Sequence, residues 1–340
     1  MRRLSSIQHL RALAALGVVL YHACQWGHVR FEIGAAGVDL FFVISGFVIG
    51  GVITDPQMSP AAFLRRRLWR VAPTYWIVTL AVLAIALAWP WLLPEVFPEP
   101  GHLVLSLLFI PHVNPEHLPF PMLPVGWSLT YEMIFYLIAA ACLILRPQRR
   151  LALLAAGLIA LPIFGVNVHP AFFLFANPMM LQFLAGALVA QVYRSGRLPR
   201  YGGGWALLAA AALAYLTLSC FDLYGSLFRP FAWGAPAALL VAGAVSLEAE
   251  NGWFRSAGLE RLGSASYSIY LCHWPVVVML AAVAGVRPAW LFVPVAGLAA
   301  IGAGLALSRW VEQPLLRLRR VTAPSPQPAA SACAELAAEA

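Results

Sequence analysis

Apolar segments long enough to cross a bilayer constrain the fold of this 340-residue chain more than any other feature. A helix needs about 20 apolar residues to cross roughly 30 Å of hydrocarbon. Here 61% of the residues are hydrophobic and only 11% are charged. The sequence therefore predicts an all-α polytopic membrane protein with about ten transmembrane helices. The expected spans are residues 7–27, 35–53, 72–92, 127–145, 151–166, 172–192, 204–220, 230–248, 266–285 and 290–312.

One further apolar piece, HLVLSLLFIPHV at 102–113, is too short to span and lies in a proline-rich stretch. We expect it to be re-entrant or interfacial, because irregular backbone at membrane depth must be covered by protein. The spans leave room for one membrane domain, residues 1–320. The remaining residues, 321–340, are rich in Pro, Ala and Ser and are expected to form a disordered cytoplasmic tail.

Arginine supplies all of the basic residues, because the chain contains no lysine. If the N-terminus is cytoplasmic, seventeen of the 22 arginines fall in loops on the cytoplasmic side. That asymmetry is the positive-inside pattern of membrane proteins and predicts that both termini are cytoplasmic. The basic residues therefore indicate the orientation of the chain in the membrane and contacts with anionic lipid headgroups. Nucleic acid is not an expected partner. The absence of lysine suggests a GC-rich genome and hence a bacterial inner membrane.

The first predicted span carries two ionisable residues, Arg11 and His22. Eleven residues at about 100° each bring both side chains to one face of the helix, about 16 Å apart along its axis. Ionisable groups inside a membrane are costly and usually functional. Two structural alternatives remain open, since Arg11 could snorkel to the headgroups and His22 could be a hydrogen-bonded core residue.

Counting depth along the spans places three titratable residues near the outer surface: His22, Asp39 and Glu132. A histidine beside carboxylates can act as a general base, with one carboxylate fixing its tautomer. His273 is expected in the cytoplasmic half, near the level of Arg11. The RRRLWR stretch at 65–70 borders that inner layer, where Arg67 and Arg70 share a helical face.

Two layers of polar residues suggest two substrates that meet within the membrane. An arginine cluster at the inner mouth suits a phosphate-bearing molecule from the cytosol, because guanidinium groups bind phosphate in fork geometry. Coenzyme A fits this description, since it carries phosphates at one end and a thioester on a flexible arm. The histidine layer suits a hydroxyl that arrives from the other side.

At these residues the sequence resembles the membrane acyltransferase 3 family, and the resemblance covers nearly the whole chain. Ten residues separate Arg11 from His22, and five further motifs follow in order along the chain. They are GVDLFFVISGF at 37–47, FLRRRLWRVAP at 63–73, GWSLTYEMIFY at 126–136, LGSASYSIYLCHWPV at 262–276 and RWVEQP at 309–314.

The resemblance implies an enzyme that transfers an acyl group, usually acetyl, from acyl-CoA to a hydroxyl of an extracytoplasmic polysaccharide, glycolipid or related acceptor. It implies that His22 is the catalytic base and that Arg11, Arg67 and Arg70 serve acyl-donor binding or the structure of the site. We expect Asp39 or Glu132 to orient His22 and His273 to take part in donor binding. No metal is expected. The extracytoplasmic hydrolase-like domain of some family members is not expected in this chain.

Several alternatives stay open at this stage. Intramembrane His, Asp and Glu also occur in proton-coupled transporters, and a non-catalytic partner of a polysaccharide synthase would use the same apolar helices. Within the acyltransferase reading, direct transfer and an acyl-histidine intermediate are both compatible with the residues. The sequence does not identify the acceptor or the oligomeric state.

Overall fold

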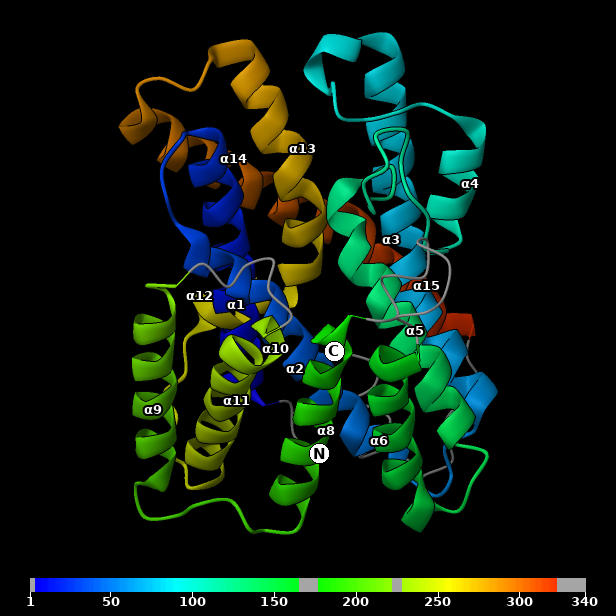
Figure 1. The fold of residues 1–340 in the computed structure, drawn as a ribbon, viewed down its shortest axis with the longest axis vertical. Coiled ribbons are helices and arrows are strands. Elements are labelled where there is room, and N and C mark those ends of the chain that lie inside the picture. Colours follow the sequence, from blue (N-terminus) through cyan, green and yellow to red (C-terminus); the bar gives the residue numbers. More distant parts are fainter. Residues whose placement is uncertain (1–3, 165–176, 222–227, 323–340) are drawn as a thin grey trace.

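The computed structural model describes residues 4–164, 177–221 and 228–322, and within these ranges the regular structure is helical throughout (Figure 1). Short 3-10 segments precede α2 and α5. The helices are α1 (Ser5–Trp26), α2 (Ala36–Ile53), α3 (Pro60–Ala88), α4 (Pro100–Leu107), α5 (Trp127–Cys142), α6 (Pro147–Phe164), α8 (Leu181–Arg194), α9 (Gly203–Leu218), α10 (Arg229–Ala232), α11 (Gly234–Ala249), α12 (Ala257–Ser264), α13 (Ser266–Ala284), α14 (Ala289–Leu307) and α15 (Gln313–Thr322).

The structure confirms an all-α, multi-pass membrane protein, and each of the ten predicted spans has a helix. Among the described residues, 7 helical stretches are long and apolar enough to cross a membrane. The other three predicted spans correspond to α6, α8 and α9. Of these, α8 has 14 residues and α9 has 16, so both are shorter than the sequence predicted. Part of the predicted span 172–192 lies outside the described residues, as does the predicted tail beyond Thr322.

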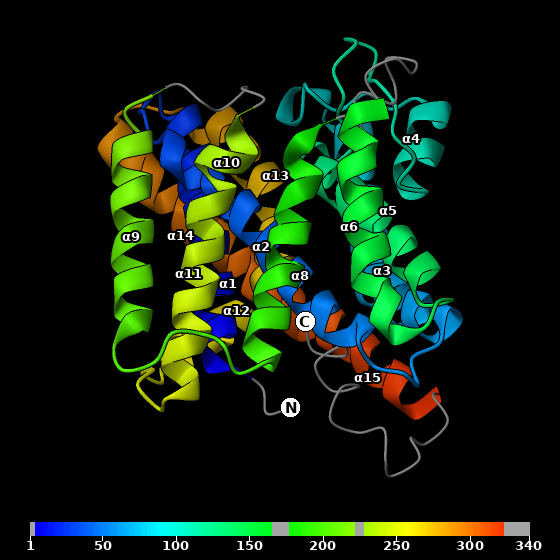
Figure 2. The same ribbon diagram turned by 60° about the horizontal axis from the view of Figure 1, so that its bottom comes forward.

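The bundle has two distinct ends (Figure 2). The helix α15 and the loops that join α8 to α9 and α11 to α12 gather at the lower end of this view, and α4 and α10 lie at the upper end. We call these ends the α15 face and the α4 face. The 102–113 segment is helical only over its first residues, and Tyr75 and Trp76 of α3 donate hydrogen bonds to the carbonyls of Ser106 and Leu107.

The helix α2 runs through the centre of the bundle, where small residues let its neighbours approach closely. A Cβ at Gly46 would lie 2.0 Å from the carbonyl oxygen of Phe183 in α8, and one at Gly37 would lie 2.3 Å from that of Ala14 in α1. Such close backbone contact is typical of membrane helix pairs. These two glycines therefore allow α2 to approach its neighbours closely, whereas a Cβ at Gly51 would meet nothing within 4 Å.

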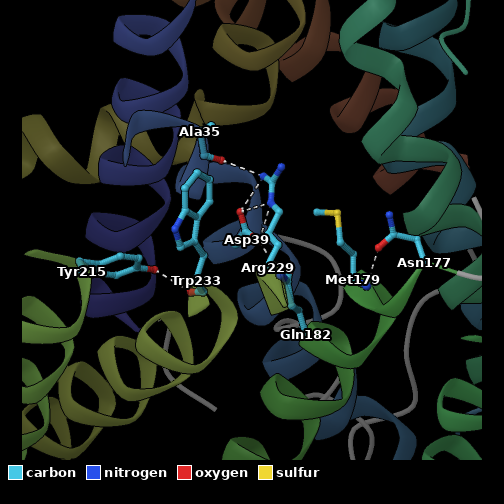
Figure 3. Close-up of polar contacts among 8 residues, drawn as sticks. All are labelled: Ala35, Asp39, Asn177, Met179, Gln182, Tyr215, Arg229 and Trp233. Atoms are coloured by element: carbon cyan, nitrogen blue, oxygen red, sulfur yellow. Dashed lines mark hydrogen bonds and ion pairs between the residues drawn. The ribbon is translucent and has the colours of Figure 1, made fainter. Parts of the chain in front are cut away.

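A buried ion pair ties α2 to the α4 face of the bundle (Figure 3). Asp39, which is 0% exposed, accepts hydrogen bonds from the Arg229 guanidinium at 2.8 to 3.3 Å and from Gln182 Nε2 at 2.5 Å. The guanidinium also donates to the Ala35 carbonyl and lies 4.9 Å from the ring centroid of Trp233. Asp39 thus joins α2, α8 and α10, and its charge is compensated without any histidine.

Breaking this pair on one side should cost more than removing it. We expect Asp39→Asn to lower the free energy of unfolding by about 3–5 kcal/mol, because a buried arginine then lacks its counter-charge. The double variant Asp39→Asn, Arg229→Met should be milder than Asp39→Asn alone. Thermal unfolding in detergent measures both, with the exposed Arg30→Met as the control. A double variant that is the least stable of the set would show that the pair contributes net stability instead.

Candidate functional site

Two histidines from different helices form the centre of the candidate site. His22 Nδ1 lies 3.1 Å from the Val18 carbonyl oxygen and 3.2 Å from His273 Nε2, and the two rings have centroids 4.8 Å apart. His273 Nδ1 lies 2.5 Å from the carbonyl oxygen of Tyr270. A carbonyl oxygen can only accept, so these contacts assign the proton of each neutral ring to Nδ1. His273 Nε2 is then an acceptor that faces the N–H of His22.

This arrangement leaves Nε2 of His22 with its lone pair available. No hydrogen bond among the described residues engages that atom. His22 also lines a cavity of about 960 Å³ on the α4 face, together with Gln25, Trp127 and Trp274. A neutral imidazole with one nitrogen held and the other open is arranged as a general base for a molecule in that cavity.

A second, smaller cavity of about 80 Å³ lies on the other side of the histidine pair and is lined by arginines. Arg11, Arg67 and Arg70 all contribute to it, and each is at most 6% exposed. Arg11 Nε donates to Ser266 Oγ at 3.1 Å. Arg70 pairs with Glu312, which also accepts a hydrogen bond from Ser268. We call this cavity the arginine pocket.

Arg67 differs from its two neighbours in the arginine pocket. Its guanidinium lies 5.9 Å from the ring centroid of Phe63 and 5.7 Å from that of Tyr136. Its Nε and Nη2 atoms are buried, and neither has a hydrogen-bond partner among the described residues. Buried charged donors are costly when unpaired, and such exceptions need an explanation. A bound anion or carbonyl oxygen would supply the missing acceptor.

One layer of side chains separates the arginine pocket from the cavity on the α4 face. Tyr270 and Ser128 line the arginine pocket, and their hydroxyl oxygens lie 2.7 Å apart. The Tyr270 hydroxyl also lies 2.9 Å from the carbonyl oxygen of Val125, which lines the larger cavity. The Tyr270 ring is 5.4 Å from that of His273. Tyr270 and Ser128 were not predicted as site residues, although they lie inside the motifs LGSASYSIYLCHWPV and GWSLTYEMIFY.

Counting depth along the predicted spans placed Glu132 near His22, but in the structure the two residues are apart. Glu132 lines the arginine pocket, where its carboxylate accepts hydrogen bonds from Ser45 at 2.9 Å and Tyr136 at 2.5 Å. The chain enters the bundle before α5 begins, since Met122 and Leu123 are 1% and 0% exposed. Glu132 therefore lies deeper in the bundle than expected from its distance to the start of the predicted span 127–145.

Asp39 is also apart from His22. It lies on the side of α2 that packs against α8, where Arg229 and Gln182 hold it. The sequence predicted that Asp39 and His22 lie at comparable depth, but it could not show which way α2 is rotated. The structure therefore offers neither predicted carboxylate as a direct partner of His22, and His273 contacts it instead.

The position of His273 corrects a second depth estimate. Expected near Arg11, it lies against His22. The reason is that α12 fills the part of the bundle nearest the α15 face, below the start of α13. It packs tightly on α1, since a Cβ at Gly263 would lie 2.0 Å from the Gln8 carbonyl oxygen. The helix α13 then starts at the level of Arg11, through Ser266, and reaches His22 two turns later.

No group of three or more His, Cys, Asp and Glu side chains that could hold a metal ion occurs within the described ranges. The site thus consists of a histidine pair between a cluster of buried arginines and an open cavity. Its groups can bind an anion, polarise a carbonyl and accept a proton.

Comparison with known proteins agrees with this chemistry. Residues 4–309 match the family model described as an acyltransferase domain. The chain is 38% identical over 321 residues to the exopolysaccharide production protein ExoZ of Rhizobium meliloti, covering 90% of this chain and 98% of that protein. It is 30% identical to the acyltransferase MdmB of Streptomyces mycarofaciens, with 96% of each chain covered.

A more distant relative is the peptidoglycan O-acetyltransferase OatA of Listeria monocytogenes, which is 24% identical over 81% of this chain and 49% of that protein. No solved structure matches the chain. The family match covers all the helices that carry the histidine pair and the three arginines. The chain therefore belongs to the membrane acyltransferase 3 family and is a membrane-bound acyltransferase.

Proposed function

We propose that this protein transfers an acyl group, in the first place acetyl, from cytosolic acyl-CoA to a hydroxyl of an extracytoplasmic glycan. The observation that carries the proposal is the place of His22, which lines the large cavity with an Nε2 that no hydrogen bond among the described residues engages, while the arginine pocket lies deeper along the same helix. The names of the relatives support a glycan acceptor and an acetyl group, since one serves exopolysaccharide production and another O-acetylates peptidoglycan.

The distribution of arginine supports the direction of transfer. The loops at the α15 face carry most of the arginines, which by the positive-inside rule makes that face cytoplasmic. In this orientation the arginine pocket lies nearer the side where acyl-CoA is made, and the cavity lined by His22 lies nearer the side where glycans are assembled. We propose a bacterial inner membrane as the location, with both termini in the cytoplasm.

Arg67 is the proposed anchor of the donor. Its unpaired N–H groups fit a phosphate or the thioester carbonyl of acyl-CoA, and Arg11 adds positive charge to the same pocket. Arg70 is neutralised by Glu312, so we assign it to the structure of the pocket. Glu132, held by Ser45 and Tyr136, offsets part of the arginine charge.

In the proposed reaction, Nε2 of His22 takes the proton of the acceptor hydroxyl while the oxygen of that hydroxyl attacks the thioester carbonyl carbon. The new C–O bond forms, the C–S bond breaks, and the thiolate of CoA takes the proton back from the imidazolium. His273 holds the reactive tautomer through the Nδ1–H of His22, a role that carboxylates fill in other enzymes. An acyl-histidine intermediate would use the same atoms.

His22→Ala should abolish transfer. Purified protein in liposomes with radiolabelled acetyl-CoA and crude cell-envelope glycan provides the assay, with label on the glycan as the readout. We expect a loss of at least about a hundredfold, because a general base contributes roughly that much or more. His117→Asn, a loop histidine outside both cavities, is the control. Retained transfer by well-folded His22→Ala protein would refute the assignment.

Arg67→Gln tests the donor site. We expect the KM for acetyl-CoA to rise about tenfold, in line with the loss of one charge-assisted hydrogen bond. The thermal unfolding temperature should not fall, because the substitution removes an unpaired buried charge. Arg65→Gln, an exposed neighbour, should change neither quantity. A lower unfolding temperature with an unchanged KM would make Arg67 a structural residue.

The role of His273, positioning of His22 or binding of the donor, can be decided by measuring kcat and KM separately in His273 variants. If it positions His22, His273→Leu should lower kcat by about ten- to a hundredfold with the KM for acetyl-CoA unchanged. His273→Gln should recover part of the rate, since its carbonyl can accept from the Nδ1–H of His22. A higher KM for acetyl-CoA at unchanged kcat would instead favour the donor-binding role that the sequence suggested.

A further inference from the structure

The cavity on the α4 face has an unusual number of aromatic walls. Tyr21, Trp26, Trp91, Phe120, Trp127 and Trp274 all line it. Trp91 is 59% exposed at a 3-10 turn, whereas Trp274 is 4% exposed and belongs to the core. Aromatic rings present flat apolar faces that pack against the C–H faces of pyranose rings, and their edges leave the sugar hydroxyls accessible. The volume of about 960 Å³ lies at the upper end of the usual range for small-molecule sites.

Among the described lining residues of the same cavity, the carboxylates are Glu95 and Glu116, and the other titratable side chains are the histidines His22 and His28. Arginine is absent from these lining residues, and the chain has no lysine. Burial and the neighbouring charge of Glu116 raise the pKa of Glu95, so the two carboxylates already repel each other. Carboxylates accept hydrogen bonds from hydroxyl groups and repel other carboxylates. They can therefore bind a neutral sugar and disfavour a sugar that carries a carboxylate.

We propose that this cavity is an acceptor subsite for uncharged pyranose residues and excludes sugars that carry a carboxylate. Trp91 provides a stacking face, and Glu95 and Glu116 bind hydroxyls and repel anions. The inference rests on the proposed function, since it assumes that the acceptor of His22 is a glycan. It goes further by naming the charge class of the glycan and the side chains that select it.

Charge selection is tested by binding to the full-length protein in detergent, without a donor. Isothermal titration compares neutral gluco-, galacto- and manno-oligosaccharides with the same chains oxidised at C6 to uronic acids. At least one neutral member should bind at least tenfold more tightly than its oxidised form. Glu95→Gln with Glu116→Gln should narrow that ratio severalfold, whereas Glu99→Gln, outside the cavity, should not. Equal or tighter binding of the oxidised chains, or no binding of any neutral chain, would overturn the proposal.

The stacking role has a matched control two residues away. Trp89 is 54% exposed but does not line the cavity. Trp91→Ala should weaken binding of the preferred neutral chain at least fivefold, Trp91→Phe should weaken it less, and Trp89→Ala should leave it unchanged. Equal losses in Trp91→Ala and Trp89→Ala would contradict the assignment.

Turnover of acetyl-CoA in the same preparations separates this proposal from the acyltransferase reaction. Transfer that depends on His22 but shows no preference for neutral chains would overturn the charge selection alone. Charge-selective binding without any transfer would overturn the proposed reaction and leave a glycan-binding cavity in its place.

Discussion

The cost of placing charge inside an apolar bundle governs how this structure is organised. Unpaired ions are expensive there, so each buried charge needs a partner or a ligand. Asp39 meets this requirement through Arg229, and Glu312 meets it through Arg70. Arg150 donates to the carbonyls of Ile53, Asp55, Leu143 and Leu145 near the ends of α2 and α5. Arg70 also has a buried Nε without an acceptor, but its charge is paired with Glu312. Arg67 differs because both its Nε and its Nη2 lack an acceptor among the described residues.

The difference between the paired buried charges and Arg67 separates charges that stabilise the fold from one that is available to a ligand. The paired charges fix α2 to α8 and α10, and α3 to the region after α14, and so hold the walls of both cavities in place. The unpaired cation lies in a pocket whose wall, formed by Tyr270 and Ser128, is one side chain thick. Beyond that wall His22, which contacts the buried His273, lines the larger cavity. A donor and an acceptor could therefore meet at His22 without a continuous open path through the membrane.

Much of the fold could be predicted because membrane helices are long and apolar. Each of the ten predicted segments contains a helix within the described residues, and seven of these helices are long and apolar enough to cross a membrane. Arg11 and the quoted motifs also include all of the residues that line the arginine pocket except Val48. What the sequence could not supply was depth and rotation. Glu132 lies deeper than expected because residues before α5 already enter the bundle, and His273 lies higher because α12 fills the level below α13. Asp39 could not be separated from His22 by counting, since the rotation of α2 depends on its packing against α8.

Vectorial transfer is the most direct test of the account. Sealed proteoliposomes of one known orientation would receive labelled acetyl-CoA on one side and acceptor glycan on the other. We expect transfer only when acetyl-CoA is at the α15 face and glycan at the α4 face, and no transfer when the two are exchanged. Equal transfer with both substrates confined to the same side would contradict it.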